Sequence, residues 1–208
     1  MSVDELLRRL DAVYADPECA LHYRSAYELT VAVVLSAQCT DKMVNEVTPD
    51  LFAAYPTVYE LADAEASDVE HIIFRTGFYR NKAKHLVGMA RRVRDEFGGE
   101  IPDEFDDLVT LPGVARKTAN VVLGEWHKRP NGVVVDTHVG RISTLLGLSA
   151  AKGPDKIAAD LEAALPQDHW IRFSLQLIEH GRQVCVARRP DCAACTLADI
   201  CPTAPAAP

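Results

Sequence analysis

The sequence predicts an all-α fold, and two observations carry this prediction. Apolar residues recur at helical spacing in several segments. A Ser or Thr followed three residues later by Glu, a pattern typical of helix starts, occurs repeatedly in the first third of the chain. One β-branched run, Gly-Val-Val-Val at residues 132–135, has the composition of a strand, but no partner strand is evident. We therefore expect this run to be a buried extended segment that leads into a helix near Asp136.

The expected helices follow in order along the chain. The Ser/Thr–Glu pattern predicts helix starts at Ser2/Glu5, Ser25/Glu28, Thr57/Glu60 and Ser67/Glu70. Apolar stripes predict the buried faces of three helices: Leu6, Leu7, Leu10, Val13 and Tyr14 in the first, Leu86, Met89, Ala90 and Val93 in a later one, and Ala119, Val122, Leu123 and Trp126 after a Pro-Gly turn.

Length and composition are those of a soluble protein. The chain has 208 residues, 48% of them hydrophobic, which suits one large domain or two small domains that share a core. No apolar run approaches the roughly 20 residues that cross a bilayer, and the first helix is acidic and amphipathic rather than secretory. We expect a cytoplasmic protein with no membrane partner. The net charge of −8 argues mildly against a protein that coats nucleic acid nonspecifically.

Charges are segregated in the middle of the chain. Residues 71–94 contain seven Lys or Arg residues and no acid, whereas residues 95–112 contain seven acids and no Lys or Arg. This pattern fits either a local face for an anionic ligand or two solvated helix faces, and the residues alone do not separate the two.

Four of the six cysteines gather near the C-terminus with the spacing C-x6-C-x2-C-x5-C. They are Cys185, Cys192, Cys195 and Cys201. Disulfides are uncommon in cytosolic chains, so this set indicates a metal centre. Four thiolates serve zinc and iron–sulfur clusters alike, so spacing alone leaves the metal open. Cys19 and Cys39 are isolated, and we expect them to be buried small hydrophobes.

One lysine stands where neighbouring positive charge disfavours its own charged form. The segment LPGVARKTA places Lys117 in the first turn of a helix, where the helix dipole and Arg116 both oppose a positive charge. An amine is a nucleophile only when it is neutral, and an ordinary lysine is almost wholly protonated at neutral pH. The placement therefore favours an activated amine, with a solvated or phosphate-binding lysine as the alternative.

Taken together, the segments LPGVARKTA, HKRPNG and VVVDTH and the four-cysteine terminus resemble the endonuclease III family of bifunctional DNA glycosylases, in the helix-hairpin-helix superfamily. The likeness extends from about Ser25 to Cys201. It implies two helical domains that flank a DNA-binding cleft: a six-helix barrel at residues 20–131, and a second domain at residues 1–19 and 132–208. The second domain would carry a [4Fe–4S] cluster in the loop at residues 185–201, bound by the four cysteines.

The resemblance also implies the chemistry of Lys117 and Asp136. Lys117 would attack C1′ of the damaged nucleotide and displace the base, and the resulting Schiff base would allow β-elimination. Asp136 would stabilise positive charge on the sugar and help to deprotonate the amine. The alternative for Asp136 is a helix N-cap, and both roles are compatible. His138, in the same VDTH segment, would position or pack rather than act as a base.

DNA contacts follow from the resemblance as well. Gln38 would fill the space of the flipped nucleotide, and Phe78 would act as an apolar wedge. Ordinary core packing is the alternative for both residues. The hairpin at Gly113, Val114, Ala115 and Arg116 would hold a phosphate through its backbone N–H groups. Further basic residues expected near DNA are Lys128, Arg129, Arg141, Arg182, Arg188 and Arg189.

The sequence departs from the family at two positions. The hairpin has Ala115 where the family usually has a second glycine, and the wedge position has Phe78 where an aliphatic residue is more common. If Ala115 needs a positive φ, it carries backbone strain of about 1 kcal/mol.

The function that these features imply is base excision repair. The protein would act as a monomer on double-stranded DNA that contains damaged pyrimidines or abasic sites. One alternative is a monofunctional glycosylase of the adenine-removing type, against which Lys117 and the chain length argue. The other is a non-catalytic helix-hairpin-helix DNA-binding protein, against which the combination of Lys117 and Asp136 argues.

Overall fold

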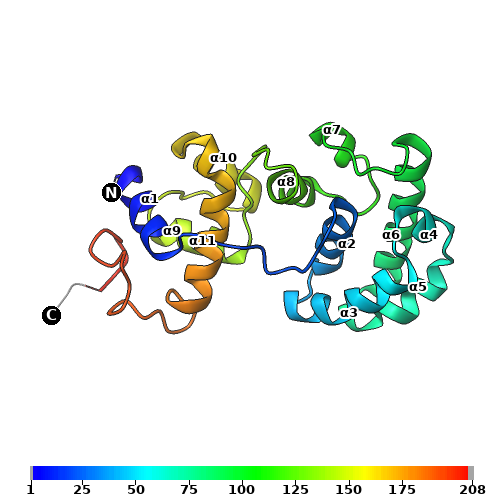
Figure 1. Cartoon of the computed structure of the whole chain (residues 1–208). Helices are drawn as coiled ribbons and strands as arrows, with labels where there is room; N and C mark the ends of the chain where they lie inside the picture. The colour runs from blue at the N-terminus through cyan, green and yellow to red at the C-terminus, as the bar shows by residue number, and fades with distance from the viewer. Residues whose placement is uncertain (1, 206–208) are drawn as a thin grey trace. The chain divides into compact units, whose positions relative to one another are not determined.

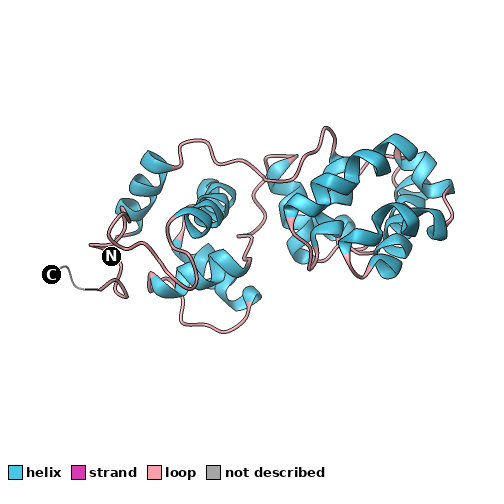
Figure 2. Ribbon diagram, turned by 90° about the horizontal axis from the view of Figure 1, so that it is seen from below, coloured by secondary structure: helices cyan, strands magenta, loops and turns pink. Residues whose placement is uncertain are grey.

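The computed structural model describes residues 2–205 of the chain, and these residues form helices joined by loops, without a β-strand (Figures 1 and 2). The all-α prediction is confirmed. Within this part of the chain, no helix is both long and apolar enough to span a bilayer. Residue 1 and residues 206–208, which belong to the ends of the expected second domain, lie outside the described residues.

The chain divides into two compact units, each with its own hydrophobic core. The central unit is Cys19–Arg129, and the terminal unit combines Met1–Glu18 with Pro130–Pro208. The domain limits expected from the resemblance were residues 20–131 for the first domain and residues 1–19 with 132–208 for the second. The terminal unit is therefore assembled from both ends of the sequence.

The central unit is built around helices α6 and α2. Helix α6 packs against α4 and α5, and α2 packs against α3 and α8. The predicted stripe of α6 is fully buried, because its members fall on one face of the helix. The bounds are α2 Ala26–Ser36, α3 Asp41–Ala54, α4 Val58–Asp63, α5 Ala66–Ile73, the 3-10 helix η1 Phe74–Thr76, α6 Tyr79–Glu96, α7 Phe105–Leu108 and α8 Arg116–Glu125.

The terminal unit packs the first helix of the chain against its last helix (Figure 1). Helix α11 lies against α9 and α1, and the core includes Leu6, Leu10, Ile142 and Phe173, each at most 1% exposed. The bounds are α1 Val3–Val13, α9 Thr137–Leu145, α10 Pro154–Ala164, the 3-10 helix η2 Gln167–His169 and α11 Trp170–Gln183.

Two members of the predicted apolar stripes are not in a core. Val13 is 46% exposed in the last turn of α1, and Trp126 is 40% exposed directly after α8. Val13 is the last residue of α1, and Trp126 is the C-cap of α8. The ring of Trp126 meets the ring of Tyr23 edge to face.

The helix-start predictions are confirmed in part. Thr57 and Glu60 form the full reciprocal capping box, and Ser25 caps α2 by accepting from the N–H of Glu28. The pair at Ser2 is wrong as a capping box, since Ser2 makes no side-chain cap and Glu5 instead pairs with two arginines. The pair at Ser67 is also wrong, because the N-cap of α5 is Glu65, two residues earlier, and Ser67 lies inside the helix.

The Val-Val-Val run lies outside every helix and is not part of a strand, and Val133 and Val135 are buried, as expected. Its N–H groups are satisfied by side chains instead of a partner strand. Glu162 of α10 accepts from the N–H of Val133 at 2.9 Å, and Ser174 of α11 accepts from Val134 at 3.2 Å. These bonds allow a segment that is not helical to lie inside an otherwise helical unit.

Candidate functional site

The segment before α8 is a tight turn, and only glycine fits its third position. Pro112 and Gly113 occupy its centre, and the N–H of Val114 donates to the carbonyl of Leu111 at 3.0 Å. Gly113 has φ +81°, and a Cβ there would lie 2.9 Å from Cβ of His85. Positive φ at the third position of a turn with Pro at the second is the arrangement of a type II turn. Val114 is buried, so it anchors the turn in the core of the central unit.

Helix α8 begins directly after this turn without a side-chain cap. Its N-cap residue is Ala115, whose side chain offers no acceptor to the first N–H groups of the helix. Lys117 is the second residue of α8 and is exposed. Arg116 is also exposed, and its guanidinium lies over the ring of Phe105, 5.0 Å from the centroid. The first turn of α8 therefore presents an exposed amine beside N–H groups that no helix carbonyl can reach.

The expectation of strain at Ala115 is wrong. Ala115 has φ −84° and ψ 170°, an extended conformation that any L-residue adopts. An N-cap residue needs this backbone region, and the positive φ of the hairpin falls on Gly113 instead. The alanine therefore replaces a glycine at no conformational cost.

Asp136 is the N-cap of α9, as the alternative interpretation anticipated. Its Oδ1 accepts from the N–H of His138 and from that of Val139, both at 2.8 Å. The carboxylate is half-buried, and both bonds use the same oxygen. The other oxygen, Oδ2, takes no part in the cap. Asp136 belongs to the terminal unit, whereas Lys117 belongs to the central unit.

His138 packs against α11 at a close approach. A Cβ at Gly181 would lie 2.5 Å from Nδ1 of His138, so the glycine makes room for the ring. Nδ1 is buried and has no hydrogen-bond partner among the described residues. This placement agrees with a packing role for the imidazole.

Gln38 and Phe78 share an unusual geometry. Gln38 has φ 53° and Phe78 has φ 48°, so both occupy the left-handed region, which costs a residue with a side chain about 1 kcal/mol. Both are exposed, and Phe78 is 65% exposed. Core packing, the alternative for both, is wrong. Strained backbone under an exposed side chain is typical of functional positions.

The basic run at residues 71–94 does not form a free face for an anionic ligand. Lys82 is buried, and Arg91 donates to the carbonyls of Ala62 and Ala64. Arg75 pairs with Glu46, and Arg94 pairs with Asp63 and Asp95. Two of the further basic residues are also engaged, since Arg129 pairs with Asp103 and Glu104, and Arg141 donates to Cys185.

The four C-terminal cysteines line one pocket of the terminal unit, which is mostly apolar. Ile142, Leu145 and Leu197 contribute to its wall. All four are free cysteines that form no disulfide, and all four are half-buried. Burial raises the pKa of the Cys195 thiol, and the other three cysteines raise it further. Cys19 and Cys39, expected to be buried, are half-buried and pack against the edge of the central core.

Donors point at the sulfur atoms. Arg141 Nη1 donates to Sγ of Cys185 at 3.5 Å, and the N–H of Leu197 donates to Sγ of Cys195 at 3.4 Å. Nε2 of the buried His180 lies 3.7 Å from Cys195 Sγ. Donors of this kind stabilise anionic thiolates, so the pocket suits a thiolate-bound group. Within residues 2–205, no three or more His, Cys, Asp or Glu side chains are placed so as to hold a single metal ion.

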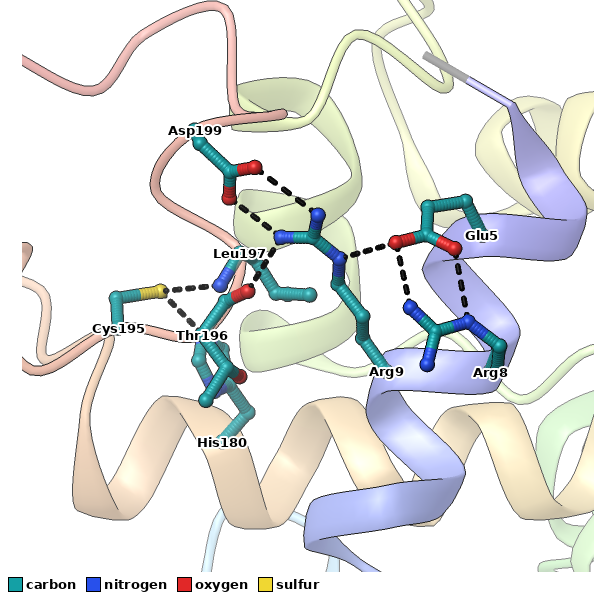
Figure 3. Close-up of polar contacts among 8 residues, drawn as sticks. All are labelled: Glu5, Arg8, Arg9, His180, Cys195, Thr196, Leu197 and Asp199. Atoms are coloured by element: carbon teal, nitrogen blue, oxygen red, sulfur yellow. Dashed lines mark hydrogen bonds and ion pairs between the residues drawn. The ribbon is translucent and has the colours of Figure 1, made fainter.

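Arg9 of α1 clasps the cysteine loop (Figure 3). Its Nη1 donates to the carbonyl of Thr196 at 2.8 Å, and the guanidinium forms a two-pronged ion pair with Asp199. Its Nε donates to Glu5 at 2.7 Å, and Glu5 also pairs with Arg8. The side chain of Arg9 therefore joins the first helix to the loop that carries the cysteines.

Two residues of interest were missed by the sequence analysis. Lys82 stands four residues before Leu86 and so continues the apolar stripe of α6, a signal of burial that was available. Arg9 offered no such signal, because its spacing from Glu5 is that of an ordinary surface ion pair.

Residues 31–167 match the family model described as HhH-GPD superfamily base excision DNA repair protein. The chain is similar to endonuclease III of Synechocystis sp., with 49% identity over 97% of this chain and 92% of the relative. It is 38% identical to endonuclease III of Bacillus subtilis, over 96% and 91% of the two chains. A solved structure of a trapped endonuclease III–DNA covalent intermediate matches with a TM-score of 0.89 and 36% identity, over 98% of this chain and 97% of that chain.

Proposed function

The chain belongs to the HhH-GPD superfamily of base excision DNA repair proteins and to its endonuclease III family, and we propose that Lys117 and Asp136 carry its reaction on oxidised pyrimidines. The protein is a DNA glycosylase that also cleaves abasic sites, and its partner is DNA. The observation that carries the assignment is the exposed amine of Lys117 in the uncapped first turn of α8, beside the Pro-Gly turn.

Lys117 is the nucleophile in this proposal. Its neutral Nζ attacks C1′ of a nucleotide that has left the base stack, and the N-glycosidic bond breaks with its electrons on the departing base. Opening of the sugar gives a Schiff base between Nζ and C1′. Loss of a proton from C2′ then expels the 3′ phosphate by β-elimination, and water releases the lysine.

Asp136 supports the first step. Its Oδ1 is held by two N–H groups at the start of α9, which leaves Oδ2 to face positive charge that develops on the sugar. A carboxylate held in this way needs no reorganisation during the reaction. The same group helps to remove the proton that Lys117 must lose before it attacks and passes this proton to the departing base, so that it is again a carboxylate while positive charge develops on the sugar.

The hairpin and two strained residues supply the DNA contacts. The N–H groups at the start of α8 suit a phosphate oxygen, since Ala115 brings no side-chain acceptor to compete for them. Gln38 and Phe78 enter the stack in place of the flipped nucleotide. Their exposure and their strained backbones support this role.

The four cysteines bind a [4Fe–4S] cluster in this proposal. Each thiolate of such a cluster binds its own iron, so the sulfur atoms need not converge on one ion. A tetrahedral zinc site would need sulfur atoms about 3.8 Å apart, given a Zn–S distance of about 2.3 Å. The apolar pocket and the donors from Arg141 and Leu197 support the cluster. When bound, the cluster holds the loop in one conformation.

Borohydride trapping tests the catalytic roles. We expect Lys117→Ala to abolish the trapped complex on an oxidised-pyrimidine duplex while duplex binding is kept, and Asp136→Asn to slow base release in single turnover. Lys42 is the matched control, because it is also the second residue of a helix and is exposed, but Thr40 caps that helix. Lys42→Ala should form the borohydride-trapped complex to the same extent as the wild type.

Three duplexes separate the alternatives. Trapping on an oxidised pyrimidine and on an abasic site supports the bifunctional enzyme. Excision of adenine opposite oxidised guanine without trapping would indicate the adenine-type glycosylase, and binding with no chemistry would indicate a non-catalytic protein. Undiminished trapping by Lys117→Ala would show that another amine is the nucleophile.

A further inference from the structure

A buried lysine in the central unit ties together the two segments that carry Gln38 and Phe78. Lys82, in the first turns of α6, is 5% exposed. Its Nζ donates to the carbonyl of Leu35 and to the carbonyl of Thr76, both at 2.8 Å. Both partners are main-chain carbonyls rather than carboxylates. An ammonium buried on such partners loses hydration without gaining an ion pair, so its retention points to a specific use.

Each carbonyl belongs to a residue that lies two or three positions before one of the strained residues. Leu35 is in the last turn of α2, three residues before Gln38, and Thr76 ends η1, two residues before Phe78. Helices α2 and α6 are in contact in the central unit (Figure 1). The last carbonyls of a helix have no partner within it. Lys82 therefore supplies a donor that the end of α2 needs, and the same ammonium holds the end of η1.

This arrangement links two otherwise separate loops. Left-handed backbone at a residue with a side chain persists only where its surroundings determine it. Gly77, at φ 68°, precedes Phe78, and a Cβ at Gly77 would meet nothing within 4 Å. A charge-assisted hydrogen bond to each of the two carbonyls restrains the backbone more strongly than a neutral hydrogen bond would.

We propose that Lys82 is a positioning residue that fixes Gln38 and Phe78 relative to each other, so that the two side chains meet damaged DNA as one preformed unit. The proposal rests on the proposed function, because it uses the DNA-inserting roles of Gln38 and Phe78. Lys82 itself is too buried to touch DNA. Its effect therefore falls on recognition of the lesion and not on binding to plain duplex.

The test compares Lys82→Met with Arg91→Met. Arg91 is a matched control, since it lies on the same helix and also donates to carbonyls, those at the end of α4. The readout is the ratio of affinities for a duplex with a non-reactive abasic analogue and for undamaged duplex, by fluorescence anisotropy. We expect Lys82→Met to lower this ratio about ten- to a hundredfold, from the size of a charged hydrogen bond, and Arg91→Met to leave it unchanged.

A double-mutant cycle separates positioning from general destabilisation. In a Gln38→Ala/Phe78→Ala background, Lys82→Met should have no further effect on the ratio, because the side chains that it positions are gone. An undiminished effect in that background would overturn the proposal. If Gln38→Ala/Phe78→Ala keeps the wild-type ratio, the DNA-inserting roles are wrong. If Gln38→Ala/Phe78→Ala lowers the ratio while Lys82→Met leaves it unchanged, the DNA-inserting roles of Gln38 and Phe78 stand and only the Lys82 proposal fails.

A measurement on the wild-type protein keeps the proposal testable if Lys82→Met does not fold. The N–H of Cys39 bonds to Ser36, and the N–H of Lys82 bonds to Phe78. If one ammonium holds both segments, native-state hydrogen exchange should give these two amides protection factors within about threefold of each other. Protection that differs by orders of magnitude would show that the segments open independently.

Discussion

At the scale of single residues, backbone conformation determines which groups can take part in chemistry. Asp136 caps a helix with one oxygen, so a structural bond orients the carboxylate. Gln38 and Phe78 hold exposed side chains on left-handed backbone. Ala115 has the extended backbone of a helix N-cap without the side chain that usually accompanies it. The start of α8 is therefore less stable than it could be, and its N–H groups stay available.

Ala115 gives a prediction at this scale. Ala115→Ser should raise the free energy of unfolding by about 1 kcal/mol, because the hydroxyl caps α8. Ala115→Gly should raise the free energy of unfolding by somewhat less than about 1 kcal/mol, because glycine is a better N-cap residue than alanine although no strain is relieved. Chemical denaturation of the three proteins checks both values.

Duplex binding supplies the functional side of the same test. Ala115→Ser should weaken binding to damaged and undamaged duplex alike, because the new hydroxyl competes with phosphate for the helix N–H groups and such contacts do not read the lesion. Ala115→Gly should bind like the wild type. Tighter binding by the glycine variant would show that the alanine methyl does obstruct the phosphate.

At the scale of elements, the first helix stabilises a loop near the other end of the chain. Arg9 bonds to Thr196 and Asp199 in the loop that carries the cysteines (Figure 3). Hydrogen bonds to Arg8 and Arg9 lower the pKa of Glu5 to about 2. Glu5 therefore stays ionised down to strongly acidic pH, and it orients Arg9 over this range. The contribution of Glu5 is present above the unfolded-state pKa of about 4.3 and is lost as pH falls towards 2.

Arg9 and Arg8 form a matched pair for testing this clasp. Both pair with Glu5, but only Arg9 reaches the loop. We expect wild-type protein to contain iron and sulfide in about equal amounts. Arg9→Gln should lose iron to a chelator several-fold faster, because removal of a partner from several hydrogen bonds costs stability of the loop. Arg8→Gln should lose it at the wild-type rate.

Two outcomes would contradict this account of the loop. Equal rates of iron loss from the Arg9 and Arg8 variants would show that the clasp does not retain the cluster. Stoichiometric zinc with no iron in the wild-type protein would show that the four cysteines form a zinc site.

At the scale of the whole molecule, continuity of the chain separates the two units. The central unit is one uninterrupted segment with its own core. The terminal unit depends on both ends, because α1 contributes Leu6, Leu7 and Leu10 to its core. Burial of one such side chain contributes about 1.5–3 kcal/mol, so loss of α1 removes a large share of the stability of that unit.

Two fragments test this difference. Residues 19–129 alone should give a helical circular dichroism spectrum and a cooperative thermal transition. Residues 130–208 alone should lack a cooperative transition, and addition of residues 1–18 through a flexible linker should restore it. A cooperative transition in the shorter terminal fragment would show that α1 is dispensable for that core.

Local patterns in the sequence determined the helical class, the Pro-Gly turn, the start of α9 at Asp136 and the cysteine set. Each depends on residues within a few positions of one another, where spacing and backbone preference decide the outcome. Only the tertiary structure decided that the Lys82 ammonium bonds to the carbonyl of Leu35 and that Arg9 reaches the cysteine loop. These features depend on partners far along the chain, and their energies come from packing and desolvation, which local sequence does not encode.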